Sequence, residues 1–330
     1  MSKKSSWFLL LELWSLSATA LVAAPLSSSH TELFRSRQVH TIKLQLTAES
    51  WNLLQPGAAA QKAVGITNRE LAKAAGVMIH PGSPGYAYVP SELNFDGRHI
   101  ANAGLRFKGN SSYSVSSATL RRPMKVDFSR FTEGGRFEGV ESLNLSNTTF
   151  DPSQIREAFA FALFKILSVP ASGTSHALVY LTVSGKYDRE YLGLYTIIEE
   201  IDEQFLKKRF GNSEGLLLKP AGMRGFAYLG EKWEQYKAIC SPRGNEPPTD
   251  CQKVIEFARL IHKADDSTFR ARIGSVLAVD EFLRYVAVNS ALINFDSFLS
   301  TGHNYYLYVN PGDHRIHFIP WDMNMCLGGY

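Results

Sequence analysis

Three polar residues near the C-terminal end of the sequence, Asp296, Asn304 and Asp322, have types and spacing suited to binding a divalent cation. Asp296 follows a helical pattern, whereas Asn304 and Asp322 flank two apolar runs separated by a turn at Pro311 and Gly312. A hairpin of these two runs would bring the three side chains together. Oxygen ligands of this kind suit Mg²⁺, which takes one or two protein carboxylates together with water and substrate phosphate. The alternative for each residue is an ordinary turn position, because Asp and Asn are common in turns.

The order of these residues resembles that of protein kinases. There, a catalytic-loop Asp is followed by a metal-binding Asn, two short strands and a metal-binding Asp. We therefore assign Asp296 as a catalytic residue and Asn304 and Asp322 as metal ligands. Asn304 comes eight residues after Asp296, which is longer than the kinase spacing, and Met323 and Asn324 stand where kinases have Phe and Gly.

Candidate phosphate-binding residues lie in the earlier segment RFKGNSS, which predicts a strand followed by a glycine turn. Such a turn can point backbone N–H groups at phosphates, and Gly109 permits a close approach. The candidates are Arg106, Lys108, Gly109, Ser111 and Ser112. Because the sequence contains neither GxGxxG nor a Walker A motif, an ordinary polar hairpin loop is the alternative.

Lys125 and Glu157 complete the predicted catalytic set. Lys125 lies on the next predicted strand, where its ammonium group can reach the α- and β-phosphates, so it is also a nucleotide-binding candidate. Glu157 lies one turn into the following helix, the position from which a kinase helix carboxylate pairs with the strand lysine. The alternatives are a solvated strand lysine and a first-turn carboxylate favoured by the helix dipole. Glu199, at the predicted crossing between lobes, is a candidate nucleotide contact.

Apolar periodicity, turn residues and helix caps predict the elements that position these side chains. Asp96-Gly97 is a hairpin turn, and Asp151 and Asp202 are predicted helix caps. The predicted strands are 41–46, 86–95, 99–109, 124–128, 140–145, 177–183, 191–198, 215–220, 304–309 and 315–320, and the predicted helices are 151–167, 203–210, 252–264 and 281–293. This order predicts an α+β chain with two lobes.

The N-terminus predicts an export signal over residues 1–24, followed by a flexible lead-in over residues 25–40. A cleaved signal would place the protein in the secreted, periplasmic or cell-surface compartment, and no other apolar stretch is long enough for a stable membrane span. Residues 56–85, rich in Ala, Gly and Pro, indicate an insertion or surface loop. A disulfide between Cys240 and Cys251 would close a turn-rich loop. The formal charge of +4 argues against a nucleic-acid partner.

Several ordered motifs give the chain a resemblance to the spore-coat CotH kinase family of atypical secreted kinases. These motifs are LRFKGNSS, RRPMKVDF, DPSQIREAF, LGLYTIIEEIDEQFL, NFDSFLSTGHNYYLY and FIPWDMN. The resemblance implies a two-lobed, atypical protein-kinase-like domain over residues 41–330, with a strand-rich N-lobe (about 41–200) and a mainly helical C-lobe (about 201–330) that is truncated. It also implies ATP and Mg²⁺, or Mn²⁺, as cofactors and transfer of phosphate to Ser or Thr of exported or surface proteins.

In this interpretation Asp296 orients or deprotonates the acceptor hydroxyl, Asn304 and Asp322 hold the metal, and Lys125 holds the phosphates. Two other functions stay open at this point. One is a different metal-dependent enzyme that processes phosphates with the same carboxylates. The other is a secreted structural or binding protein that keeps the fold without catalysis.

Overall fold

The computed structural model describes residues 32–34, 38–55 and 86–329. The predicted export signal and the predicted insertion at residues 56–85 lie outside these ranges, so both stay predictions. Within the predicted lead-in, Glu32–Phe34 forms the short 3-10 helix η1, and Leu33 is buried against the first hydrophobic core.

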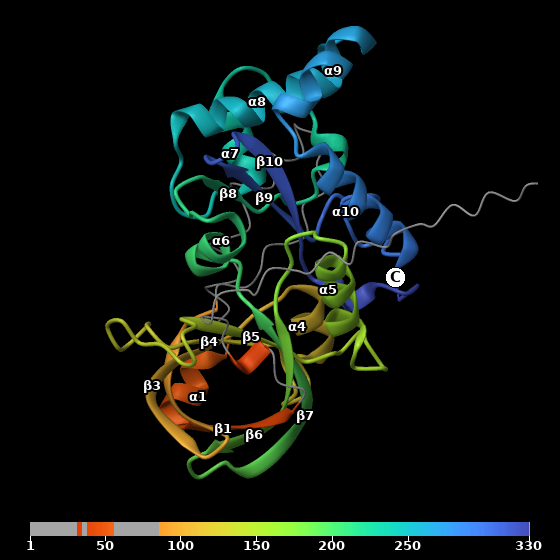
Figure 1. Ribbon diagram of the computed structural model, residues 1–330. Coiled ribbons are helices and arrows are strands. Elements are labelled where there is room, and N and C mark those ends of the chain that lie inside the picture. The colour runs from red at the N-terminus through yellow and green to blue at the C-terminus, as the bar shows by residue number, and fades with distance from the viewer. Residues whose placement is uncertain (1–31, 35–37, 56–85, 330) are drawn as a thin grey trace, which may run out of the picture. The chain divides into compact units, whose positions relative to one another are not determined.

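Seven strands form a closed barrel in the order β1-β2-β3-β4-β5-β7-β6 (Figure 1). Apolar side chains alternate along the strands and fill its interior, and β6 alternates regularly between buried and partly exposed positions. The strands are β1 (Val39–Leu46), β2 (Val89–Phe95), β3 (Arg98–Phe107), β4 (Met124–Asp127), β5 (Ser142–Ser146), β6 (Thr174–Val183) and β7 (Tyr187–Glu199).

The barrel closes through a parallel pair, β1 with β6, in which Ile42 lies opposite Val179. The other neighbouring strands pair antiparallel. Helix α1 (Ala48–Leu54) contributes Trp51 and Leu54 to the same core, and Thr47 caps it by accepting a hydrogen bond from the Ser50 N–H. Closure leaves no strand of the barrel with a free edge.

The remaining elements surround a second hydrophobic core built on a three-stranded sheet in the order β10-β9-β8. These strands are β8 (Leu216–Leu218), β9 (Tyr305–Asn310) and β10 (Arg315–Pro320). Helices pack around them, and α8 buries one apolar face that includes Val254, Phe257 and Ala258. The helices are α5 (Arg156–Ile166), α6 (Glu203–Phe210), α7 (Trp233–Cys240), α8 (Pro248–Lys263), α9 (Asp266–Arg272) and α10 (Val279–Ala291).

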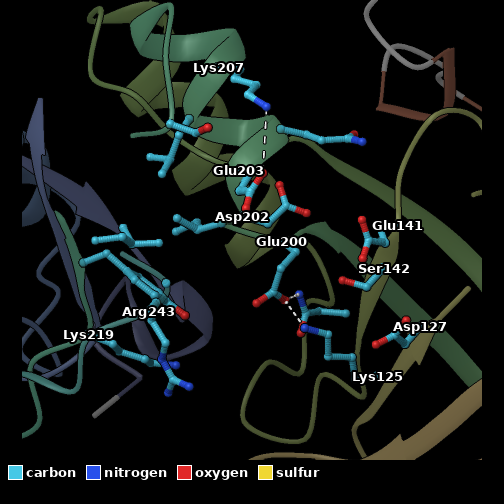
Figure 2. A pocket seen from close by; sticks show the side chains of 18 of the residues that line it. Lys125, Asp127, Glu141, Ser142, Glu200, Asp202, Glu203, Lys207, Lys219 and Arg243 are labelled. Atoms are coloured by element: carbon cyan, nitrogen blue, oxygen red, sulfur yellow. Dashed lines mark hydrogen bonds and ion pairs between the residues drawn. The ribbon is translucent and has the colours of Figure 1, made fainter. Parts of the chain in front are cut away.

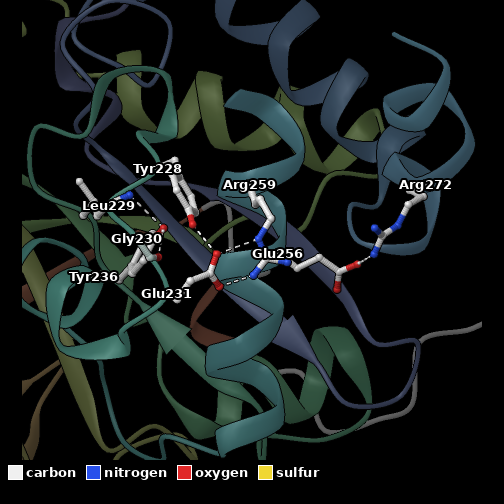
Figure 3. Close-up of polar contacts among 8 residues, drawn as sticks. All are labelled: Tyr228, Leu229, Gly230, Glu231, Tyr236, Glu256, Arg259 and Arg272. Atoms are coloured by element: carbon white, nitrogen blue, oxygen red, sulfur yellow. Dashed lines mark hydrogen bonds and ion pairs between the residues drawn. The ribbon is translucent and has the colours of Figure 1, made fainter. Parts of the chain in front are cut away.

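A polar network ties α8 to the segment that precedes α7. Figure 3 shows the Glu231 carboxylate accepting hydrogen bonds from the Tyr228 hydroxyl and the Arg259 guanidinium. The Tyr236 hydroxyl accepts from the Leu229 N–H at 3.0 Å and donates to the Gly230 carbonyl at 3.1 Å. These bonds fix the chain between β8 and α7, which also contains the cavity residue Lys219.

The predicted fold class is wrong. The described residues form a closed, mixed seven-stranded barrel together with eight α-helices, rather than a two-lobed kinase-like fold with a helical C-lobe. Strand periodicity predicts that a segment is extended but not which strand it pairs with, so the parallel closure of β1 on β6 leaves no local signal. The sheet β10-β9-β8 likewise joins segments that lie far apart in the sequence.

Three local predictions also need correction. The first long helix begins at Arg156 rather than after Asp151, because Gln154 has a left-handed backbone with φ 62°; the Asp151 carboxylate still accepts from the Arg156 N–H at 2.7 Å. The serine-rich turn forms a short helix, α4 (Ser111–Ser116). Cys240 and Cys251 are buried free thiols, so the predicted disulfide is not formed.

The Asp96-Gly97 hairpin turn and the cap of α6 are confirmed. β2 and β3 pair antiparallel across that turn, and Phe95 lies opposite Arg98. Asp202 accepts from the Phe205 N–H, and Gly211 ends α6 with φ 81°. No helix among the described segments is long and apolar enough to cross a bilayer.

Candidate active site

A cavity of about 740 Å³ lies between the barrel strands β3, β4 and β5 and the chain that follows β7 and β8. Its wall carries seven cationic side chains against five carboxylates, which favours an anionic ligand. Figure 2 shows Lys219 and Arg243 across the cavity from Lys125. The cations are Arg106, Lys108, Lys125, Arg136, Lys207, Lys219 and Arg243, and the carboxylates are Asp127, Glu141, Glu200, Asp202 and Glu203.

Lys125 and Glu200 form an ion pair on the barrel side of this cavity. The Lys125 Nζ lies 3.1 Å from the Glu200 Oε2, which also accepts a 2.5 Å hydrogen bond from the Asn144 side-chain amide. Burial alone would raise the pKa of Glu200, but the charges of Lys125 and Lys108 outweigh burial and lower that pKa to about 2. Both groups are therefore charged at neutral pH, and Lys125 is compensated by Glu200.

Two more lysines face the cavity in less compensated surroundings. Burial lowers the pKa of Lys108 and of Lys219 to about 8 in each case, although Glu200 and Asp322 act in the opposite direction. The Lys108 Nζ donates to the Asn144 Oδ1 at 2.7 Å. Both ammonium groups also lie near the ring of Trp321, at 5.2 Å for Lys108 and 5.3 Å for Lys219.

Asp296 and Asn304 are held in direct contact. The Asn304 side-chain amide donates to both the backbone carbonyl and the Oδ2 of Asp296, each at 2.8 Å, and the Thr301 hydroxyl donates to the Asp296 Oδ1 at 3.1 Å. The Asn304 backbone is left-handed, with φ 61°, and its carbonyl accepts from the Trp321 N–H at 3.1 Å. That backbone bond connects this pair to the residue before Asp322.

Asp322 and Glu157 lie in the same electrostatic neighbourhood. Burial raises the pKa of Asp322, the Asp296 charge raises it further, and Lys108 and Lys219 oppose the increase. Burial, reinforced by the charge of Asp322, raises the pKa of Glu157 to about 8. The Glu157 Oε2 is buried and has no hydrogen-bond partner among the residues with described side chains. Asp322 thus lies within electrostatic range of both Glu157 and Asp296.

These residues fit a magnesium ion that keeps part of its coordination shell for water and phosphate. Two carboxylates and one amide supply few protein ligands, which is the usual situation for Mg²⁺ at a phosphate site. Within the described ranges, no group of three or more His, Cys, Asp or Glu residues is placed to hold a metal ion, so an ion bound here would take most of its ligands from water and phosphate. The Glu157 Oε2 has no hydrogen-bond partner among the residues with described side chains, and because Glu157 interacts electrostatically with Asp322, a cation bound at Asp322 would also stabilise the Glu157 carboxylate.

Some predicted site residues lie away from the cavity wall. The Glu199 carboxylate accepts from the Gly173 N–H at 2.7 Å and from Arg209 at 2.9 Å, so it connects β6 to α6. Gly109 has φ 83°, as a glycine turn requires, but neither it nor Ser111 nor Ser112 lines the cavity. Glu157 does not pair with Lys125, whose carboxylate partner is Glu200.

The structure also identifies cavity residues that the sequence did not single out. Lys219, Arg243 and Tyr306 line the side opposite the barrel, and Glu200 replaces Glu199 as the carboxylate facing inward. Glu199 is the last residue of β7 and is engaged with Gly173 and Arg209, whereas Glu200 directly follows the strand and pairs with Lys125. Lys219 follows three apolar residues and shows no pattern that marks it as a site residue.

Fold and site together describe a protein with a cavity lined by more cationic than acidic side chains, two of whose lysines interact electrostatically with Asp322. The family model described as "CotH kinase protein" matches residues 105–330, which is more than half of the chain. The chain therefore belongs to the CotH kinase family, and the resemblance noted in the sequence is confirmed. A comparison with curated protein sequences finds no match.

Proposed function

We propose that this protein is an ATP- and Mg²⁺-dependent phosphotransferase that phosphorylates Ser or Thr of exported or surface proteins. The observation that carries the proposal is that the buried Asp322 carboxylate interacts electrostatically with two sets of charged residues. Its carboxylate interacts electrostatically with the cavity lysines Lys108 and Lys219 on one hand and with Asp296 on the other. A ligand that is both anionic and metal-bound suits this arrangement, and membership of the CotH kinase family supports a kinase-like activity.

Each residue then has a defined task. The Asp296 carboxylate, oriented by Asn304 and Thr301, accepts the proton of the acceptor hydroxyl as that oxygen bonds to the γ-phosphorus. The bond from the γ-phosphorus to the β,γ-bridging oxygen breaks, and ADP leaves with that electron pair. Asp322 and Asn304 would hold Mg²⁺, which would neutralise phosphate charge when bound. Lys108 and the compensated pair Lys125–Glu200 position the phosphates.

The proposal that the acceptor proteins are exported or on the cell surface rests on a separate prediction, the export signal. Residues 1–24 have the charge and apolar pattern of an export signal, so enzyme and acceptor would meet outside the cytoplasm. N-terminal sequencing of the protein purified from the producing cell's envelope or medium tests this point. A chain beginning near residue 25 supports it, whereas an intact Met1 in the cytoplasm contradicts it.

Phosphate transfer from ATP labelled at the γ-position, with casein as a generic acceptor and Mg²⁺ present, tests the activity. The wild type should label the acceptor, and Asp296→Asn and Asp322→Asn should each lower the rate by about 10³-fold or more, as is typical when a group that acts in the transition state is removed. Asp188→Asn is the matched control because Asp188 is an exposed residue of the β7 strand. Equal rates in the wild type and Asp296→Asn would disprove the proposed chemistry.

A further inference from the structure

Lys219 directly follows β8 and lies on the cavity wall opposite the barrel (Figure 2). Its backbone N–H donates to the Ser241 carbonyl at 3.2 Å, and the Ala221 N–H donates to the Ile239 carbonyl at 3.1 Å. These bonds anchor the segment to the end of α7. The side chain therefore starts from a rigid backbone, which is the condition for a binding residue that loses little entropy on contact with a ligand.

The ammonium group of Lys219 lies between aromatic rings instead of beside a carboxylate. Its Nζ is 5.0 Å from the ring centre of Tyr306 and 5.3 Å from that of Trp321. No carboxylate oxygen of the described residues lies within 4.0 Å of it, in contrast to Lys125 with Glu200 at 3.1 Å. A recessed ammonium group of this kind is stabilised when an anion enters the cavity.

Lys108 faces the same indole ring, with its Nζ 5.2 Å from the ring centre. Two positive charges are thus held around one aromatic side chain, and each lies close enough to interact with Asp322. Lys108 directly follows the barrel strand β3, and Lys219 directly follows β8. The two lysines therefore reach the cavity from its two opposite sides. Like charges held together in this way are a recurring feature of sites for polyanions.

We infer that Lys219 and Lys108 form a two-lysine clamp, closed by Trp321, for the phosphate chain of a nucleoside triphosphate. Asp322 does not itself line the cavity, but its carboxylate interacts electrostatically with both lysines, so an anion held between them would be close enough to interact with a metal ion on Asp322. A metal-bound oligophosphate is the ligand that satisfies both features. The identity of the nucleotide rests on the proposed function, whereas the clamp itself rests on the geometry of the two lysines and the indole ring.

Titration calorimetry with three probes tests the clamp: a non-hydrolysable ATP analogue with Mg²⁺, inorganic tripolyphosphate, and adenosine. Lys219→Gln should weaken binding of the first two by about tenfold or more, since a charge-assisted hydrogen bond is lost, and leave adenosine binding unchanged. Lys219→Arg keeps the charge and should restore most of the affinity. Lys237→Gln is the matched control, because Lys237 lies on α7, pairs with Glu246 at 2.6 Å and does not line the cavity.

The outcomes separate the clamp from the proposed function. Wild-type affinity of Lys219→Gln for the ATP analogue and tripolyphosphate would overturn the clamp and leave the kinase proposal standing. Binding of tripolyphosphate that Lys219→Gln weakens, without binding of the ATP analogue, would keep the clamp and overturn the nucleotide. A wild type that binds neither probe would overturn both. Melting curves of each variant show whether the fold is intact.

Discussion

The carboxylate of Asp296 and the side-chain amide of Asn304 are joined by a 2.8 Å hydrogen bond across the loop that connects α10 to β9. A second bond from the same amide reaches the Asp296 backbone carbonyl. The amide therefore fixes both the loop and the orientation of the proposed catalytic carboxylate. This contact gives Asn304 a positioning role in addition to the metal-binding role proposed above.

Replacing Asn304 with Ala should lower the rate of phosphate transfer by about 100-fold, because a misplaced catalytic group loses much of its effect. Thr301→Val, which removes only the bond to Asp296 Oδ1, should have a smaller effect. The measurement is the initial rate at saturating ATP, with a melting curve to show that the variant is folded. An Asn304→Ala enzyme as fast as the wild type would contradict both roles.

The ion pair of Glu200 with Lys125 should make the fold sensitive to acid. The pKa of Glu200 is lowered to about 2 in the folded protein, so its stabilisation is fully present above the unfolded value near 4.5 and is lost as the pH falls toward 2. Glu200→Gln should destabilise the protein at pH 7 by about 3 kcal/mol, since Lys125 is left buried without its partner. Urea unfolding at pH 7 and pH 3 measures both effects. A variant as stable as the wild type at pH 7 would show that the pair contributes nothing.

Lys219, which we propose binds phosphate, should lower the stability of the ligand-free protein because its charge is buried. Its pKa of about 8 lies below the unfolded value of 10.5, so the penalty is fully present below pH 8 and disappears as the pH rises to 10.5. Lys219→Met should therefore raise the free energy of unfolding at pH 7 by about 1 kcal/mol. Lys237→Met, at an exposed ion-paired site, should not. Loss of stability in Lys219→Met would show that the aromatic contacts outweigh burial of the charge.

His317 should make the folded protein less stable as the pH rises, because its protonated ring is held by two carboxylates. Burial alone would lower the pKa of His317, but Glu281, at 3.0 Å, and Asp313, at 3.1 Å, outweigh burial and raise it. The stabilisation is fully present below the unfolded value near 6.5 and is lost as the pH rises through the higher folded value. Glu281→Gln should remove about 1 kcal/mol of stability at pH 5.5 and much less at pH 8.5. Equal losses at the two pH values would exclude His317 as the cause.

Local signals in the sequence predicted many elements but not their arrangement. The Asp-Gly turn and the cap at Asp202 act through neighbouring residues, and the structure contains both. The pairing of Ile42 with Val179 depends on packing of residues distant in the chain, so it left no trace in the periodicity. The left-handed backbone of Gln154 makes α5 begin at Arg156. The capping pattern in the sequence does not predict this conformation.

For the candidate site, residue types in an ordered motif were more informative than isolated charges. Asp296, Asn304 and Asp322 lie on loops at the ends of α10, β9 and β10, and the structure brings the first two into contact. The lysine clamp depends on Lys219, which meets Trp321 only through the tertiary fold. The two arginines of the RRPMKVDF motif illustrate this, because both are engaged in structural bonds. Arg121 donates to the Thr148 hydroxyl and the Leu194 carbonyl, and Arg122 donates to the Gln55 side chain and the Ser117 carbonyl.

The parallel seam between β1 and β6 constrains the order in which the molecule can be assembled. β1 pairs with β2 on one side and with β6 on the other. Because more than a hundred residues separate β1 from β6, the second pairing can form only after all of these residues have been synthesised. Contacts of such long sequence separation form slowly. Until they form, β1 and the strands beside it expose unpaired backbone groups, and a nascent chain interrupted before Thr174 would carry an open edge that favours aggregation.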